Sequence, residues 1–188
     1  MKFSIKKTQL INNLNYLARA IPPRSTLPIL SCALFSYKKE LLNIRSTDLE
    51  VSISLDIKTT NGEEGRVAIP LNKLMEITNA MPDDLIKFSV SDIGKVNIEC
   101  KYGQYTIMGL SPEEFPTEQS IENSQTFTVS GEELKDIINN TSYAASRDDL
   151  KPVLQGVLFQ IEKEGIVSVA TDGHRLVKLE KKKLHDLD

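Results

Sequence analysis

The chain has 188 residues, 40% of them hydrophobic and 26% charged, and a formal net charge of −3. This composition is typical of an ordinary globular protein with a buried core, so it excludes the disordered and fibrous classes. The negative net charge argues against a surface that is basic throughout, so any contact with nucleic acid must be local.

Neither a targeting segment nor a redox motif is evident in the sequence. Residues 1–6 lack an apolar run of signal-peptide length, and no stretch approaches the roughly 20 apolar residues of a membrane span. We therefore expect a cytoplasmic protein. Cys32 and Cys100 lie in alternating apolar segments without a C-x-x-C pair, so we expect two buried, reduced thiols. No metal and no cofactor is expected.

The first predicted elements are a strand at 2–5 and a helix after it. The helix is marked by one apolar stripe, because leucine or isoleucine recurs at i, i+4, i+7 and i+11: Leu10, Leu14, Leu17 and Ile21. An apolar run at 27–35 and a strand that ends in Thr47 and Asp48 come next. The order predicted for this unit is strand, helix, strand, strand.

A second set of elements follows the first. Residues 66–70 have the pattern of a strand and 71–81 that of an amphipathic helix. Three short strands, separated by turn signals, are expected at 86–90, 96–100 and 105–110. Together with the first set, they predict one α+β domain with two helices on one side of an antiparallel sheet.

An internal repeat relates the start of the chain to residues after 124. An offset of 124 positions pairs twelve identical residues without a gap, at Phe3, Leu10, Asn15, Ala20, Pro28, Leu30, Leu34, Phe35, Lys39, Glu40, Thr47 and Asp48. The second copy should begin with a strand at 126–129. Ser130 and Glu133 then form a capping-box pattern that starts a helix. Duplication is the simplest explanation.

A seven-residue run in the second copy carries the sharpest family signature: Ala170-Thr171-Asp172-Gly173-His174-Arg175-Leu176. Weaker family segments occur in matching order at residues 1–3, 26–30, 46–50 and 114–116. On these segments the sequence resembles the bacterial DNA polymerase III beta subunit family, the DNA sliding clamps, from Met1 to about Leu179.

The resemblance implies the DNA-clamp (processivity) fold, an α+β fold of repeated β-α-β-β-β units with helices lining a pore and antiparallel sheets outside. Such subunits have three similar domains, and two subunits close head to tail into a homodimeric ring around duplex DNA. The chain resembles the complete first domain, 1–124, and the amino-terminal part of the second, 125–188. We therefore expect domain 3 to be absent and the chain alone not to form the ring.

The resemblance also implies a pocket that accepts short peptide motifs of clamp partners. Its members here would be Lys151, Leu154, Thr171, Gly173, His174, Arg175 and Leu176. An extended peptide needs an apolar floor and a few polar groups that fix its register. The family often has Arg where this chain has Lys151, and a Lys lacks the planar fork of donors. The alternative is a plain turn, bent at Asp172 and Gly173, with solvated side chains after it.

Four cations are candidates for contact with DNA phosphates: Arg24, Lys73, Arg19 and Arg147. Arg24 falls on a family position linked with DNA, whereas the other three are placed by geometry on predicted pore-facing helices and in the second repeat's loop. A sliding ring should touch phosphates without reading bases. The alternative is that these side chains are ordinary solvated surface.

Three functions remain open. The preferred one is a non-enzymatic clamp that tethers the DNA polymerase III catalytic subunit, the clamp loader and other motif-bearing proteins to double-stranded DNA, with no membrane partner. The second is a stand-alone module that binds clamp-motif peptides without encircling DNA. The third is a metal-dependent hydrolase using Asp172 and His174, although the chain lacks H-x-x-x-H, P-loop and G-x-S-x-G motifs.

Overall fold

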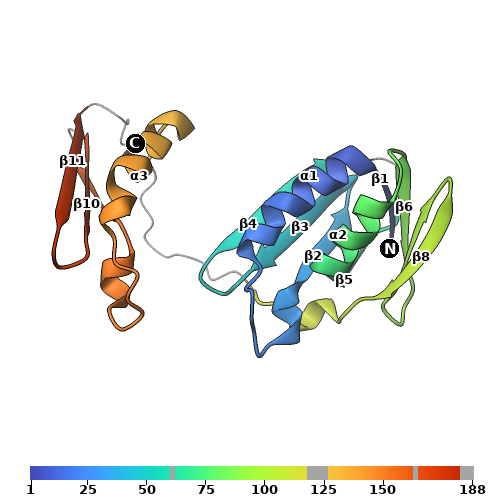
Figure 1. Ribbon diagram of the computed structural model, residues 1–188. Coiled ribbons are helices and arrows are strands. Elements are labelled where there is room, and N and C mark those ends of the chain that lie inside the picture. Colours follow the sequence, from blue (N-terminus) through green and yellow to red (C-terminus); the bar gives the residue numbers. More distant parts are fainter. Residues whose placement is uncertain (60–61, 118–126, 163–164, 183–188) are drawn as a thin grey trace. The chain divides into compact units, whose positions relative to one another are not determined.

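The structure is a computed structural model that describes residues 1–59, 62–117, 127–162 and 165–182. The chain is divided into two compact units, Met1–Gln119 and Ser120–Asp188 (Figure 1). The predicted domain limits, 1–124 and 125–188, remain a prediction, because residues 118–126 lie outside the described residues. Each unit is described by itself.

The first unit contains the β-α-β-β-β pattern twice, which confirms the α+β clamp fold. Its first half is β1 (Lys2–Lys6), α1 (Lys7–Leu17), β2 (Cys32–Lys38), β3 (Leu41–Thr47) and β4 (Ser52–Lys58). Its second half is β5 (Gly65–Pro70), α2 (Leu71–Ala80), β6 (Leu85–Val90), β7 (Lys95–Cys100) and β8 (Gly103–Met108). Short 3₁₀ turns occupy Ala18–Ala20, Pro28–Ser31 and Pro112–Glu114.

Two antiparallel sheets take the place of the single sheet predicted from the pattern. Their strand orders are β4-β3-β2-β5 and β1-β6-β7-β8. The halves exchange their first strands, since β1 pairs with β6 and β5 pairs with β2. Such pairing joins segments far apart in sequence, so local periodicity does not reveal it. The exchange makes the two halves one folding unit.

One apolar core joins both sheets to both helices. Phe3 of β1 stacks on Phe88 of β6 with ring centroids 4.6 Å apart, and Phe35 of β2 stacks beside them. Leu10 and Leu14 of α1 are fully buried in the same cluster. The two helices lie side by side (Figure 1), and most of their exposed residues are polar, among them Asn12, Asn15, Asn72, Lys73, Glu76 and Asn79. Amphipathic helices therefore expose one polar surface.

Several element ends differ from the sequence pattern for local reasons. Ile21 ends the predicted stripe, yet α1 stops at Leu17 and Ile21 is already extended. The apolar run at 27–35 begins with a 3₁₀ turn, Pro28–Ser31, in which the Ser31 hydroxyl donates to the Pro28 carbonyl.

Cys32 is buried as predicted, and burial raises the pKa of its thiol. Cys100 is only half-buried, so that part of the prediction was wrong.

The second unit reproduces the first at the offset of the sequence repeat. Helix α3 (Gly131–Thr141), the 3₁₀ turns Ser142–Ala144 and Pro152–Gln155, and strands β10 (Gly165–Thr171) and β11 (Leu176–Lys182) each lie 124 residues after a counterpart with the same length. Strand β9 (Leu158–Glu162) completes a sheet of order β11-β10-β9. The capping signal is also confirmed, because the Ser130 hydroxyl accepts the Glu133 N–H at 3.1 Å.

The strand predicted at 126–129 does not form as expected. Thr126 lies outside the described residues, Phe127 makes a single β-bridge, and Thr128 and Val129 are in no strand. Its counterpart β1 pairs with β6, whereas in the described part of the second unit β9, β10 and β11 pair only with one another.

Across the described residues, no helix is both long and apolar enough to span a membrane.

Candidate functional site

The signature run folds into a tight turn between β10 and β11. The Thr171 hydroxyl donates to the Arg175 carbonyl at 2.7 Å and accepts the Gly173 N–H at 3.1 Å. Asp172 Oδ1 accepts the backbone N–H groups of His174 and Arg175, both at 2.9 Å. Gly173 has φ +90°, a conformation that glycine adopts at little cost. Threonine and aspartate therefore build the bend, and glycine permits it.

The same bonds give the Asp172 carboxyl a strongly acidic character. The Arg175 N–H, then the His174 N–H, stabilises the charged form and lowers the pKa of Asp172 to about 2. The Arg175 guanidinium adds to this, with Nε 2.9 Å from Asp172 Oδ2. An acid this strong is ionised throughout the neutral range. It therefore serves as a fixed acceptor in the turn rather than as a general acid or base.

The first unit contains the same turn at residues 47–51. Thr47 Oγ1 donates to the Val51 carbonyl at 2.9 Å and accepts the Leu49 N–H at 3.0 Å. Asp48 Oδ1 accepts the N–H groups of Glu50 and Val51. Threonine and aspartate thus have one structural role in both copies, whereas the three residues after them differ. Any chemistry specific to the turn of the second unit must come from those variable positions.

A hollow of about 700 Å³ opens beside the turn of the second unit. Four of the predicted site residues line it: Arg147, Lys151, His174 and Arg175. The other lining residues are Ser142, Tyr143, Ala145, Ser146, Asp148, Gln155 and Asp172. The hollow thus holds three permanent cations against two aspartates, and its size is within the range of small-ligand and peptide side-chain sites. We call it the turn hollow.

Local bonds hold the wall of the turn hollow between α3 and β9. The Ser146 N–H donates to the Leu154 carbonyl at 2.8 Å, and the Lys151 N–H donates to the Asp148 carbonyl at 3.0 Å. Asp148 Oδ1 accepts the Leu150 N–H at 3.0 Å. Lys151 and Arg147 are exposed on this wall. Their positions are consequently set by backbone bonds rather than by packing of their own side chains.

The remaining predicted pocket residues do not line the turn hollow. Thr171 and Gly173 act in the turn itself, Leu154 is half-buried, and Leu176 begins β11 with 63% of its surface exposed. The Tyr143 ring, which the sequence reasoning missed, lies 6.0 Å from the Arg175 guanidinium carbon. The sequence did contain a signal for Tyr143. The repeat aligns it with Arg19, so an aromatic ring replaces a cation at equivalent positions of the two units.

The predicted DNA contacts are divided between the two units. Arg24 is exposed in the loop before the turn Pro28–Ser31, and Lys73 is exposed on α2. Arg19 lies in the 3₁₀ turn after α1, not on the helix itself, with its guanidinium carbon 5.8 Å from the Tyr16 ring centroid. Arg147 lies in the turn hollow. The structure therefore groups Arg147 with the peptide-pocket candidates.

The hydrolase alternative gains nothing from this geometry. The Asp172 carboxylate accepts the backbone N–H of His174 and the guanidinium Nε–H of Arg175, so none of its described hydrogen bonds comes from the imidazole. In the described ranges, no group of three or more His, Cys, Asp or Glu side chains is arranged to hold a metal ion. A metal-activated hydrolytic centre would require such a cluster.

Comparison with known proteins gives consistent matches over both units. The "Beta sliding clamp" of Staphylococcus epidermidis is 32% identical over 184 residues, which cover 94% of this chain and 49% of that protein. That of Staphylococcus aureus is 31% identical with the same coverage. The crystal structure of DNA polymerase III subunit beta from Pseudomonas aeruginosa superposes with a TM-score of 0.90 at 29% identity, covering 98% of this chain and 50% of that one.

The chain thus spans about half the length of the relatives it matches. Residues 1–119 match the family model of the DNA polymerase III beta subunit, N-terminal domain. Residues 128–186 match the model of the central domain of the same subunit. On these matches, which run through both structural units, the chain belongs to the DNA polymerase III beta subunit family.

Proposed function

We propose that the protein works as part of a DNA sliding clamp, which encircles duplex DNA as a homodimeric ring and tethers DNA polymerase III and other proteins without catalysing a reaction. One observation carries the proposal: relatives named beta sliding clamp align with 94% of the chain, through both units. A cytoplasmic location follows from that role. Because those relatives are about twice as long, encirclement is proposed for the assembled protein.

The exposed cations support a weak, sequence-independent grip on DNA. Arg19, Arg24 and Lys73 are all exposed on the first unit. The surrounding helix surface includes four exposed asparagines, which are polar but uncharged, and the net charge of the chain is −3. A few cations on such a surface neutralise a few phosphates, so the attraction stays shallow enough for the ring to slide.

The turn hollow supports docking of short partner peptides. Its cations, Arg147, Lys151 and Arg175, can pair with acidic or carbonyl groups of an extended peptide. Half-buried Leu154 and exposed Leu176 do not line the hollow, but each is next in sequence to a lining residue and offers apolar surface for the peptide's hydrophobic side chains. A Tyr143 ring against Arg175 gives the site a rigid aromatic edge. The proposed partners are the polymerase, the clamp loader and other proteins with such motifs.

Retention on DNA of different topology tests the clamp function. The protein from the complete reading frame, loaded on nicked circular plasmid by a clamp loader with ATP, should co-elute with the plasmid and be released when a single cut linearises it. A closed ring stays on circular DNA because it encircles the duplex, and it can slide off once the DNA has free ends. Equal retention on circular and linear DNA would contradict the proposal.

A peptide titration tests the turn hollow directly. A fluorescent peptide with a clamp-binding motif should bind more weakly to the Arg175→Ala variant of the protein from the complete reading frame than to the unaltered protein, by about tenfold or more, because a charge-assisted contact is lost. Lys178→Ala on β11 is the matched control, since Lys178 is exposed and pairs with Glu180 outside the hollow. Equal losses in both variants would indicate a general charge effect.

The stand-alone module is the less favoured alternative. It requires the 188-residue chain to bind clamp-motif peptides tightly by itself. We expect weak binding, because the family pocket is implied to draw on a further domain. A submicromolar dissociation constant for this chain would overturn that expectation and favour the module.

A further inference from the structure

The sheet β4-β3-β2-β5 has a second apolar surface, on the face that points away from the two helices. Successive residues of a strand point to opposite faces of a sheet. Phe35 of β2 packs with the helices in the main core, so Leu34 points to the other face. Leu34 pairs with Arg45 of β3 on one side and with Ala68 of β5 on the other. These three residues form a row across the outer face of the sheet.

Residues 110–116, which come after β8, cover this row. Phe115 is buried in one cluster with five residues of the outer face and the 3₁₀ turn before β2: Ile29, Leu30, Cys32, Leu34 and Ala68. The Leu110 N–H donates to the Ala68 carbonyl at 2.8 Å, and the Ala68 N–H donates to the Leu110 carbonyl at 3.2 Å. The yellow 3₁₀ turn of this segment, Pro112–Glu114, lies against β5 (Figure 1). We call residues 110–116 the cover segment.

Arg45 fastens the end of the cover segment. Its Nη2 donates to the Pro116 carbonyl at 2.6 Å, and its guanidinium carbon lies 5.2 Å from the centroid of the Phe115 ring. A charged donor on a carbonyl and a cation over an aromatic ring are both stronger than contacts between neutral groups. The repeat places Val169 at the equivalent position of the second unit. The anchoring cation is therefore specific to the first unit.

The repeat also identifies the surface that the cover segment occupies. Leu30, which lies under it, is the counterpart of Leu154, a member of the proposed peptide site of the second unit. The neighbouring residue Ile29 is 7% exposed, whereas its counterpart Val153 is 90% exposed. The first unit thus covers with its own chain a surface whose equivalent is accessible in the described part of the second unit.

We propose that the cover segment is an autoinhibitory element, which occupies on the first unit the surface equivalent to the peptide-docking surface of the second and so confines docking to the second unit. The inference rests on the proposed peptide docking. The cover segment itself has the features of a docked peptide, because it bonds the backbone of a strand and fills an apolar site with one aromatic side chain. Once it is released, the surface accepts another segment of that chemistry.

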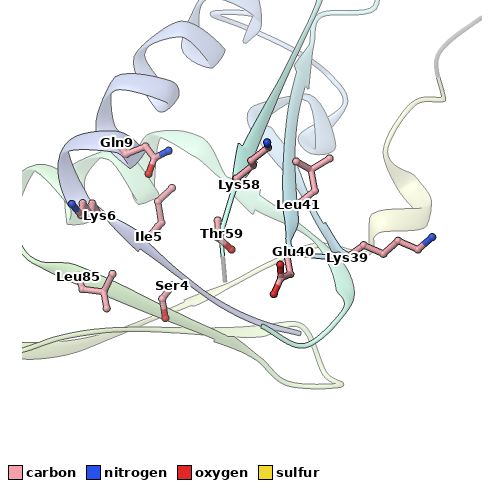
Figure 2. A pocket seen from close by; sticks show the side chains of 10 residues that line it. All are labelled: Ser4, Ile5, Lys6, Gln9, Lys39, Glu40, Leu41, Lys58, Thr59 and Leu85. Carbon is pink, nitrogen blue, oxygen red and sulfur yellow. The ribbon is translucent and has the colours of Figure 1, made fainter. Parts of the chain in front are cut away.

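An open hollow of the first unit provides the internal comparison. It has a volume of about 680 Å³ and lies between β1, the turn that joins β2 to β3, and the end of β4 (Figure 2). Three lysines stand around it, Lys6, Lys39 and Lys58 (Figure 2), and none of its lining residues belongs to the cluster under the cover segment. The cover segment contains two glutamates. A free peptide of its sequence that is attracted by charge alone should therefore bind at this hollow.

Amide hydrogen exchange, read by NMR, measures whether Arg45 holds the cover segment closed. Opening breaks the bond of the Leu110 N–H, so that amide reports it. Arg45→Met removes the charged contacts and keeps an apolar stem, so exchange at Leu110 should accelerate by about tenfold. Arg66→Gln is the matched control, because Arg66 forms only an exposed ion pair with Glu113, 3.6 Å long, and the change should be about twofold or less. Equal acceleration in both variants would contradict the anchoring role.

A synthetic peptide with the sequence of residues 110–117 tests whether the surface accepts a separate chain. In the isotope-labelled 188-residue chain with Phe115→Ala, it should cause saturable amide shifts at Leu30 and Leu34, and in the unaltered chain it should not. Arg45→Met serves as a second open variant if Phe115→Ala does not fold. A peptide in which alanine replaces the phenylalanine should bind at least about tenfold more weakly, because the buried aromatic surface is lost. Shifts only around Lys6 and Lys39 would overturn the proposal.

A clamp-motif peptide separates failure of this inference from failure of the proposed function. The complete protein should bind one such peptide per subunit, and its Phe115→Ala variant should bind two. Arg175→Ala, added to that variant, should weaken only the site in the second unit. One peptide per subunit in the open variant would overturn the inference and leave the proposed function intact. Absence of binding to every variant would overturn both, because the docking on which the inference rests would be missing.

Discussion

The two turns at residues 47–51 and 171–175 have one scaffold and different chemistry. Each is closed by a threonine hydroxyl and an aspartate carboxylate that bond backbone groups three or four residues on. The variable positions are Leu-Glu-Val in the first unit and Gly-His-Arg in the second. Duplication thus preserved the residues that fold the turn and changed the three residues that follow them. A repeat of this kind distinguishes positions that fold the turn from positions that are free to differ.

The units also differ in how much apolar surface the repeated helix buries. In α1, Leu10, Leu14 and Leu17 are fully buried, whereas in α3 the counterpart of Leu14 is Ile138, which is 40% exposed. The first unit surrounds its helices with two sheets, and the described part of the second has one. The same helix therefore contributes more to the stability of the first unit than of the second.

The largest expected effect tests that contrast in helix burial. Leu14→Ala should lower the unfolding free energy of the first unit by about 2–5 kcal/mol, because it leaves a cavity in a closed core. Ile138→Ala at the equivalent position should cost less than about 1 kcal/mol, because much of that side chain is already in water. Urea denaturation followed by circular dichroism measures both. Similar losses would mean that Ile138 is buried in solution.

A smaller effect concerns the third position of each turn. Gly173→Ala should cost about 1–2 kcal/mol, because an added Cβ meets no atom within 4 Å and only the positive φ opposes it. Leu49 already has a side chain at φ +82°. Leu49→Gly should therefore stabilise the first unit by up to about 1 kcal/mol, since relief of strain exceeds the flexibility that glycine adds.

Thermal unfolding of these two variants in the same buffer measures their changes in stability, which should have opposite signs. Loss of stability in both would mean that the Leu49 side chain makes a contact in solution that outweighs its backbone strain. In that case the two turns would differ in packing as well as in chemistry.

The acid range offers a third test, through the two aspartates. Backbone N–H groups lower the pKa of Asp172 from 3.8 to about 2, and the Val51 N–H, foremost, lowers the pKa of Asp48 as well. A lowered pKa in the fold means that the stabilisation is complete above the unfolded value and is lost as pH falls. Both turns should therefore be unaffected at neutral pH and weaken below about pH 4.

Carboxyl carbon chemical shifts, followed by NMR during an acid titration, measure the two pKa values separately. Asp172 should titrate below Asp48, because only Asp172 has a guanidinium partner. Arg175→Ala should raise the pKa of Asp172 toward that of Asp48 and leave Asp48 unchanged. An Asp172 carboxyl that titrates at its ordinary value would indicate that the turn is open in solution.

Much of the fold could be predicted from the sequence, because apolar periodicity and helix capping depend on residues close together in the chain. The α1 stripe, the Ser130 cap and the repeat located the helices, and the signature run located the turn. The pairing of β1 with β6 could not be predicted, since it depends on strands far apart in the chain. The 3₁₀ turn at Pro28–Ser31 was also missed, because its residues are apolar and resemble a strand.

The turn hollow was predicted in parts rather than as a whole. Lys151, His174 and Arg175 were named through the family signature and Arg147 as a DNA contact, and the structure puts all four around one hollow. Tyr143 and Asp148 were not named, because neither follows an apolar period nor belongs to the signature. Which side chains share a hollow depends on how the loop after α3 folds back to the turn. Hydrogen bonds within that loop, such as those of the Ser146 and Lys151 N–H groups, fix its path.

The smallest expected effect concerns one core position that differs between the repeats. Ile44 is fully buried in β3, and its counterpart in β10 is Ser168, 1% exposed, whose hydroxyl has no partner among the described residues. Ser168→Ala should stabilise the second unit by about 0.5–1 kcal/mol, because it removes the cost of an unsatisfied buried hydroxyl and adds no volume. Ser36→Ala, at a half-buried position of β2, is the control and should be neutral. Denaturant titration measures the stability of both variants. A loss of stability in Ser168→Ala would show that the hydroxyl forms a hydrogen bond in solution. In that case β10 would accommodate the buried serine through that bond and without a loss of stability.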